Sequence, residues 1–112
     1  MHIHIEGVEG LPIIHEGDDL PSLICERTSF SDGDILCIAS SVYSKAKGYT
    51  RFLSDISPSE RAIRIAQRTR EDPRFIQAVL DCSTDILLEY PFVLSEISTG
   101  HIGVRAGVDQ SN

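Results

Sequence analysis

Residues 72–80, Asp72-Pro73-Arg74-Phe75-Ile76-Gln77-Ala78-Val79-Leu80, carry the strongest structural signal in this chain of 112 residues. An aspartate followed by proline is typical of a helix start. The carboxylate accepts hydrogen bonds from backbone N–H groups of the first turn, where proline needs no N–H of its own. Apolar residues then follow at helical spacing: Phe75, Ile76, Val79, Leu80, Ile86 and Leu87. The pattern predicts a core helix that continues until Tyr90-Pro91 ends it.

The segments on either side of this helix also have defined signals. Residues 92–97 read as a strand, residues 98–100 as a turn and residues 101–105 as its hairpin partner. Upstream, Ser57-Pro58-Ser59-Glu60 is a capping box with proline at the first helical position, which predicts a second helix. Together these signals predict two helices next to a hairpin in the C-terminal half of the chain.

The first half of the chain predicts two further strands and one short helix. His2-Ile3-His4-Ile5 alternates polar and apolar residues, and residues 35–39 form a continuous apolar run typical of a strand buried on both faces. Asp18 or Asp19 caps a short helix with Pro21 in its first turn. We therefore expect an α+β (mixed α/β) fold. Two or three helices would pack on a small mixed sheet whose strands lie near Ile3, Ile35, Phe92 and Ile102.

Composition bounds the class of protein. The hydrophobic content of 41% and charged content of 24% are those of an ordinary globular domain. A net charge of −7 argues against general binding to nucleic acid or anionic membranes. The three cysteines have no metal-ligand spacing, which predicts reduced, mostly buried thiols in a cytoplasmic protein. No apolar run approaches the ~20 residues of a membrane span, and no signal peptide is visible.

Two stretches are candidates for nucleotide contacts. Ser40, Ser41 and Lys45 follow the predicted buried strand, and ligands of α/β sheets usually lie at the carboxyl ends of strands. Hydroxyl and ammonium groups suit phosphates, although the spacing is not that of a P-loop and a solvated loop is the alternative. The turn Gly10-Leu11-Pro12-Ile13-Ile14 either packs on the core or holds a flat heteroaromatic base, and the sequence alone leaves both open.

The chain ends in Ala106-Gly107-Val108-Asp109-Gln110-Ser111-Asn112. Gly107 permits a tight turn, and the oxygens of Asp109, Ser111 and Asn112 are of the kind that Mg²⁺ takes. The alternative is a polar loop without a ligand.

Taken in order, the chain resembles the N-terminal part of the coenzyme F(420)-0:gamma-glutamyl ligase family (coenzyme F(420)-0:L-glutamate ligases) of methanogens and some other archaea and bacteria. No single motif decides this, but seven in order do, and they cover essentially all of residues 1–112. The matching residues are 10–13, 16–20, 32–34, 40–46, 58–62, 72–74 and 106–112.

The resemblance implies a homodimeric, GTP-dependent ligase that uses Mg²⁺ or Mn²⁺. A monovalent cation is a further cofactor that it allows. GTP would phosphorylate a carboxylate of the deazaflavin coenzyme precursor, and L-glutamate would displace the phosphate. Carried over by position, the implied GTP contacts are Leu11, Pro12, Ile13, Ile14, Ser40, Ser41, Lys45 and Asn112. Asp109 is the implied metal ligand.

The chain departs from the family pattern in residues and in length. The usual Ser-Lys-Ala-Glu-Gly-Arg is here Ser44-Lys45-Ala46-Lys47-Gly48-Tyr49, and Arg105 stands where asparagine is usual. Members are about twice as long, and the resemblance implies that their second half, absent from residues 1–112, carries further metal ligands. We therefore expect this chain alone to be catalytically silent. The alternative is a non-catalytic nucleotide- or coenzyme-binding regulatory domain of the same fold.

Overall fold

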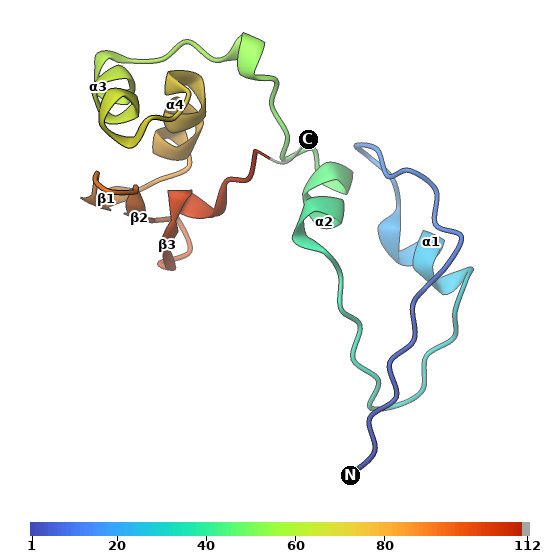
Figure 1. The fold of residues 1–112 in the computed structure, drawn as a ribbon. Coiled ribbons are helices and arrows are strands. Elements are labelled where there is room, and N and C mark those ends of the chain that lie inside the picture. Colours follow the sequence, from blue (N-terminus) through green and yellow to red (C-terminus); the bar gives the residue numbers. More distant parts are fainter. Residues whose placement is uncertain (111–112) are drawn as a thin grey trace. The chain divides into compact units, whose positions relative to one another are not determined.

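The structure is a computed structural model and describes residues 1–110 (Figure 1). The chain forms two compact units, an N-terminal unit of residues 1–50 and a C-terminal unit of residues 51–112. Each unit has its own cluster of buried apolar side chains. Among the described residues no helix is long and apolar enough to span a membrane.

The N-terminal unit holds two short helices, α1 (Leu20–Cys25) and α2 (Ser40–Ala46). The carboxylate of Asp19 caps α1 by accepting hydrogen bonds from the backbone and hydroxyl of Ser22, and these bonds lower the pKa of Asp19. Ile14, Leu20, Ile24 and Ala46 form a small core. The predicted helix and its aspartate cap are therefore confirmed.

The two strands predicted in this unit are absent. Residues 1–9 and 34–39 are extended but pair with no other strand of the described chain. Ile3, Ile5 and Ile35 are 79, 87 and 87% exposed, so the apolar run around Ile35 is not buried on either face. A strand needs a neighbour for its backbone groups, and apolar patterning alone does not supply one.

The C-terminal unit packs two helices against a sheet. Helix α3 (Glu60–Thr69) begins after Ser59, whose hydroxyl accepts a hydrogen bond from the backbone of Ala62. The cap therefore lies two residues later than the Ser57-Pro58 signal predicted. Helix α4 (Pro73–Asp81) begins after Asp72 as expected, and hydrogen bonds from Arg74 lower the pKa of Asp72 to about 2.

Helix α4 ends earlier than its apolar pattern predicted. It stops at Asp81, and Ile86 and Leu87 belong to strand β1 (Asp85–Leu88). The hydroxyl of Ser83 donates to the Val79 carbonyl oxygen at 2.6 Å, and the backbone N–H of Thr84 donates to the Glu96 carbonyl oxygen at 2.8 Å. These bonds end the helix and begin strand pairing, which helical spacing alone does not reveal.

The sheet has three antiparallel strands in the order β1-β2-β3, with β2 (Leu94–Glu96) in the centre and β3 (Ile102–Val104) at one edge. The hairpin of β2 and β3 confirms the prediction. The core consists of Ala62, Ile65 and Ala66 from α3, Phe75, Ile76 and Val79 from α4, and Val93 beside β2. Burying each larger side chain stabilises the fold by roughly 1.5–3 kcal/mol.

The described residues thus contain four α-helices, a three-stranded antiparallel sheet and two 3-10 helices, η1 (Leu53–Asp55) and η2 (Arg105–Gly107). The α+β class is confirmed, with more helices and fewer strands than expected. The thiols of Cys25, Cys37 and Cys82 are free and exposed, which corrects the prediction of buried cysteines. Cys37 lies in the uncovered extended segment, and the other two lie at or just beyond helix ends.

Candidate functional site

The turn formed by residues 10–14 lies at the surface of the N-terminal unit and is anchored at both ends. Gly10 has φ +73°, and the guanidinium of Arg27 donates to its carbonyl oxygen at 2.8 Å. Ile14 is buried in the core, whereas Ile13 is 81% exposed. Ile14 therefore packs on the core while Pro12 and Ile13 face solvent, and the contact with a heteroaromatic base stays a prediction.

The hydroxyl and ammonium candidates lie on helix α2 rather than on a loop after a strand. Ser40 and Ser41 form its first turn and Lys45 its last, and all three are exposed. Ser41 and Lys45 are four residues apart, so they share one face of the helix. The predicted setting at a strand end is therefore wrong, but the residues still present a hydroxyl and an ammonium group on one surface.

The turn and helix α2 belong to the same small core. Ile14 and Ala46 are members of one buried cluster, and Leu11 packs against it. The backbone N–H of Gly17, shortly after the turn, donates to the Ala46 carbonyl oxygen at 3.0 Å. The turn and α2 are about 30 residues apart in sequence, and this packing holds both predicted nucleotide segments within one unit.

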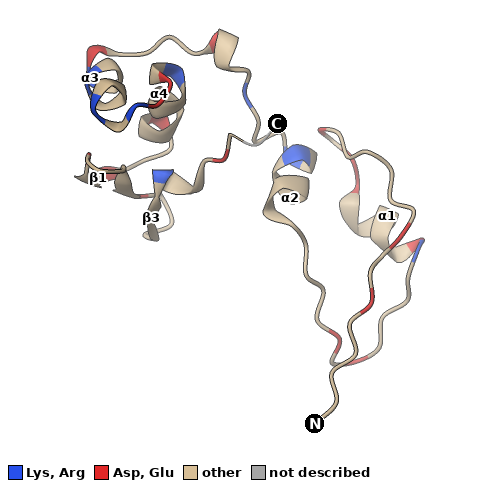
Figure 2. Cartoon of the chain, in the orientation of Figure 1, with Lys and Arg blue, Asp and Glu red and all other residues tan. Residues whose placement is uncertain are grey.

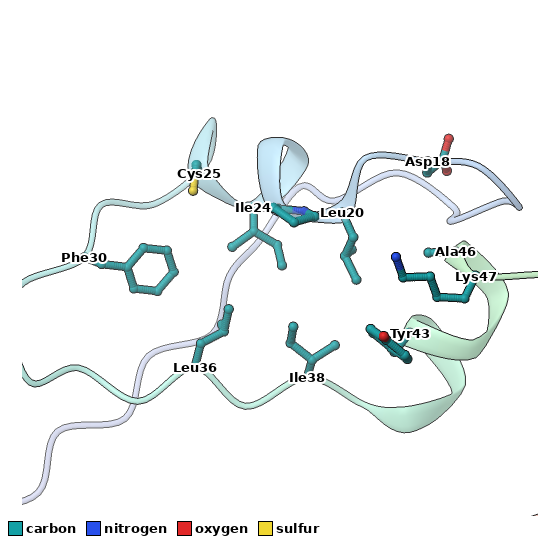
Figure 3. A pocket seen from close by; sticks show the side chains of 11 residues that line it. Asp18, Leu20, Ile24, Cys25, Phe30, Leu36, Ile38, Tyr43, Ala46 and Lys47 are labelled. Atoms are coloured by element: carbon teal, nitrogen blue, oxygen red, sulfur yellow. The ribbon is translucent and has the colours of Figure 1, made fainter. Parts of the chain in front are cut away.

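A cavity of about 280 Å³ lies between α1, residues 30–38 and α2 (Figure 3). Its walls are mainly apolar, and Phe30, Leu36, Ile38 and Tyr43 point toward its centre. The Lys47 ammonium lies 5.8 Å from the centroid of the Tyr43 ring. Of the predicted nucleotide contacts that the structure describes, none lines this cavity.

Asp109 lies in the C-terminal unit, directly after η2 and Val108. Arg105, Ala106 and Gly107 all have positive φ, of 55°, 52° and 71°. Arg105 and Ala106 are not glycines, so a positive φ strains their backbone. Such a conformation persists only where surrounding contacts hold it. Gly107, which the sequence identifies as a residue that permits a tight turn, adopts this positive φ.

Several contacts fix the stretch that precedes Asp109. The Arg105 backbone N–H donates to the Val93 carbonyl oxygen at 2.8 Å, and the Arg105 guanidinium forms an ion pair with Glu71. The same guanidinium lies 5.7 Å from the centroid of the Phe75 ring. Ala106 and Val108 pack against the core of this unit. Asp109, which is itself exposed, is therefore carried by a well-anchored segment.

The described residues do not supply a complete set of ligands for a metal at Asp109. No group of three histidine, cysteine, aspartate or glutamate side chains in the part of the chain that the structure describes is placed to hold a metal ion. Ser111 and Asn112 lie outside the described residues. Mg²⁺ bound by one or two carboxylates relies on substrate phosphates for further ligands. Asp109 therefore fits such an ion as a single ligand and not as a complete site.

Several other charged groups have structural partners. Asp18 accepts a hydrogen bond from the His15 backbone N–H at 2.7 Å, and Asp19 caps α1, so these two aspartates serve the turn and the helix start. Figure 2 shows basic residues on helix α3 and at the start of α4. Arg61 pairs with Glu89 at 2.8 Å and Arg68 lies over the Tyr90 ring at 5.2 Å. Part of this arginine-rich surface is accordingly engaged within its own unit.

Comparison with known proteins identifies the family. A family model described as F420-0:Gamma-glutamyl ligase matches residues 9–112. A coenzyme F420:L-glutamate ligase of Methanosarcina mazei is 52% identical over 105 residues, covering 94% of this chain and 41% of the relative. Proteins of the same name from Halobacterium salinarum and Archaeoglobus fulgidus are 46 and 48% identical, covering 98 and 100% of this chain. They are covered over only 46 and 45% of their own length, so the chain spans less than half of these relatives.

Proposed function

The chain belongs to the F420-0:gamma-glutamyl ligase family, and we propose that it supplies the N-terminal, nucleotide-binding part of a GTP-dependent ligase. The reaction would join L-glutamate to a deazaflavin coenzyme precursor. The observation that carries this proposal is the identity of about 50% along the whole chain to proteins named coenzyme F420:L-glutamate ligase. Because the chain spans less than half of their length, the activity is proposed for a complete site to which these residues contribute.

The proposed chemistry follows from the need to activate a carboxylate. A carboxylate oxygen of the precursor would attack the γ-phosphorus of GTP, giving an acyl phosphate and GDP. The glutamate amine would then attack the acyl carbon, so that the amide forms and inorganic phosphate leaves. A divalent ion, when bound, supplies positive charge to the transferring phosphoryl group.

The residues of the N-terminal unit would bind and orient the nucleotide. The backbone of residues 11–14 would hold the base, with the exposed Pro12 and Ile13 beside it. Ser41 and Lys45, on one face of α2, would bind phosphate oxygens, because a hydroxyl and an ammonium both donate to them, and Ser40 would add a second hydroxyl. Support for this grouping comes from the core that the turn and α2 share.

Asp109 would hold the divalent ion and Asn112, which is not described, would contact the nucleotide. One carboxylate does not bind Mg²⁺ tightly, so the 112-residue chain alone is expected to bind nucleotide weakly and to be inactive. The homodimer and the monovalent cation implied by the family resemblance belong to the same proposal, as does the cytoplasmic location expected from the cysteines.

The test measures GDP release and amide formation from GTP, L-glutamate and the precursor. The first sample is the 112-residue chain. The second is a chimera in which this chain replaces the matching part of the Archaeoglobus fulgidus relative. We expect turnover by the chimera alone. Robust turnover by the isolated chain would contradict the prediction that it is incomplete, and a folded but inactive chimera would contradict the proposed function.

A second candidate is a non-catalytic nucleotide-binding domain of the same family. Titration of GTP with Mn²⁺ separates the two readings. Micromolar affinity of the isolated chain together with an inactive chimera would favour the binding domain. Weak affinity together with an active chimera would favour the ligase part.

A further inference from the structure

Residues 34–39 form an extended segment whose backbone is uncovered. None of the N–H or carbonyl groups of residues 35–38 makes a hydrogen bond within the part of the chain that the structure describes. Bonds begin only at its two ends, where Asp34 closes a turn with Ser31 and Ala39 starts α2. Unpaired backbone in an extended conformation is a ready template for another strand.

The side chains of this segment alternate in the manner of a strand. Leu36 and Ile38 line the apolar cavity next to α1 and α2, as Figure 3 shows, and remain 44 and 43% exposed. Ile35, on the other side, is 87% exposed. An isoleucine side chain is rarely this exposed to solvent in a complete folded protein when its neighbours are also apolar. Both faces of the segment therefore lack a covering layer.

The N-terminal segment has the same character. Residues 1–9 make no backbone hydrogen bond among the described residues, and Ile3 and Ile5 are 79 and 87% exposed. Residues 1–9 and 35–38, two extended segments of the N-terminal unit, thus have backbone N–H and carbonyl groups without hydrogen bonds to the rest of the described chain. This is an interaction surface for polypeptide and not for a small molecule, because the open groups run along a line of backbone.

We propose that residues 34–39, together with residues 1–9, form a sheet with a β-strand from the polypeptide that corresponds to the remaining length of the relatives. The chain covers only 41–46% of those relatives, so a polypeptide of comparable size is the natural source of the strand. Alternate side chains of that strand would enter the cavity beside Leu36 and Ile38. This inference uses family membership but none of the GTP or glutamate chemistry.

Charge argues for that partner over a second copy of this chain. Residues 1–9 contain Glu6 and Glu9, Asp34 begins the second segment, and Asp32 lies two residues before it. Two copies meeting here would bring these carboxylates together in a chain whose net charge is already −7. The strand that fits is apolar at alternate positions and has basic residues at its ends.

Hydrogen–deuterium exchange tests the proposal. The isolated chain is compared with the chimera that carries the remaining part of the Archaeoglobus fulgidus relative. We expect amides of residues 35–38 and 3–9 to exchange at least tenfold more slowly in the chimera, while amides of α4 stay equally protected in both. Fast exchange at 35–38 in a chimera with a protected α4 would overturn the proposal. If the chimera does not fold, the separately produced C-terminal part is titrated into the chain with the same readout.

Two variants and one control sharpen this test. Ile35→Lys changes a residue that is 87% exposed, so it should leave the isolated chain unaffected and abolish the protection in the chimera. Ile63→Lys, on the outer face of α3, should leave that protection in place. Slow exchange of residues 35–38 in the isolated chain that disappears on dilution would instead identify a second copy as the occupant and overturn the proposal. Because the readout is protection, an inactive chimera with slowed exchange would contradict only the proposed function.

Discussion

Arg105 and Glu71 form an ion pair that ties the start of η2 to the connection between α3 and α4. The Glu71 side chain is only 16% exposed, and the Arg105 guanidinium also lies over the Phe75 ring. The pair therefore fastens the backbone that leads to Asp109 onto the helical layer of the C-terminal unit. Since Arg105 and Ala106 are held at positive φ, this attachment also holds a strained turn in place.

Replacing Arg105 by alanine should destabilise the C-terminal unit. The variant removes the cation from a mostly buried carboxylate, and leaving such a group without a partner costs about 1–3 kcal/mol. The measurement is the free energy of unfolding from urea titration followed by circular dichroism. Arg61→Ala is the matched control, because its pair with Glu89 is half-exposed on both sides and is worth about 0–1 kcal/mol. Equal losses in the two variants would show that the Arg105 pair has no special role.

Ser95 provides a second test of the core. It lies in the central strand β2, is fully buried, and its hydroxyl has no hydrogen-bond partner within the described chain. Ser95→Ala removes that unpaired group and should leave the free energy of unfolding unchanged or raise it by about 1 kcal/mol. In Ser83→Ala, the lost hydroxyl donates to Val79 at 2.6 Å, so stability should fall by about 1 kcal/mol. A clear loss in Ser95→Ala would mean that its hydroxyl is bonded in solution.

The cap of α4 predicts a specific dependence on pH. The pKa of Asp72 is lowered from 3.8 to about 2 by hydrogen bonds from the side chain and backbone of Arg74. A lowered pKa in the folded state means that the charged form stabilises the fold above the unfolded pKa. That contribution is lost as the pH falls from about 4 to about 2. Thermal unfolding should therefore depend less on pH in this window for Asp72→Asn than for the unmodified chain. Asp32→Asn, which changes an exposed turn residue, is the control, and identical profiles for all three proteins would contradict the assignment.

Local signals in the sequence predicted α1, α3, α4 and the β2–β3 hairpin, but they missed α2 and placed two strands in the N-terminal unit that do not form among the described residues. The helix caps at Asp19 and Asp72 depend on residues within one helical turn of them, so the local sequence predicts them. The runs around Ile3 and Ile35 read as strands, but strand formation depends on a partner that is not among the described residues. Ile86 and Leu87 fitted a helical period by coincidence, and no glycine or proline marks the end of α4 at Asp81.

The candidate site was predictable as a set of residues and not as an arrangement. Ser41 and Lys45 were identified by their chemistry, yet their placement on a helix follows from the packing of Ala46 in the small core. The cavity beside Tyr43 depends on residues of three segments and has no motif in the sequence.

Asp109→Asn should separate metal binding from folding. The substitution keeps the size of an exposed side chain but removes its charge, and a carboxylate is the ligand that a hard divalent ion requires. We expect GTP affinity of the chimera in the presence of Mn²⁺ to fall at least tenfold, with unchanged affinity in EDTA and an unchanged circular dichroism spectrum. Asp32→Asn serves again as the control. An unchanged Mn²⁺ dependence in Asp109→Asn would show that this residue is not a ligand.

Lys45 and Lys47 lie two residues apart at the end of α2 and offer a matched pair for the phosphate site. Lys45 shares a face with Ser41, whereas Lys47 lies over the Tyr43 ring and lines the apolar cavity. Each is replaced by methionine, which keeps the length of the side chain and removes its charge. If Lys45 binds phosphate oxygens, Lys45→Met should weaken GTP binding to the chimera about tenfold, because a charge-assisted hydrogen bond contributes roughly 1.5–3 kcal/mol. Lys47→Met should bind GTP as the unmodified chimera does, and calorimetric titration of GTP, GDP and GMP measures both. A larger loss in Lys47→Met than in Lys45→Met would move the phosphate site from the outer face of α2 to the mouth of the cavity.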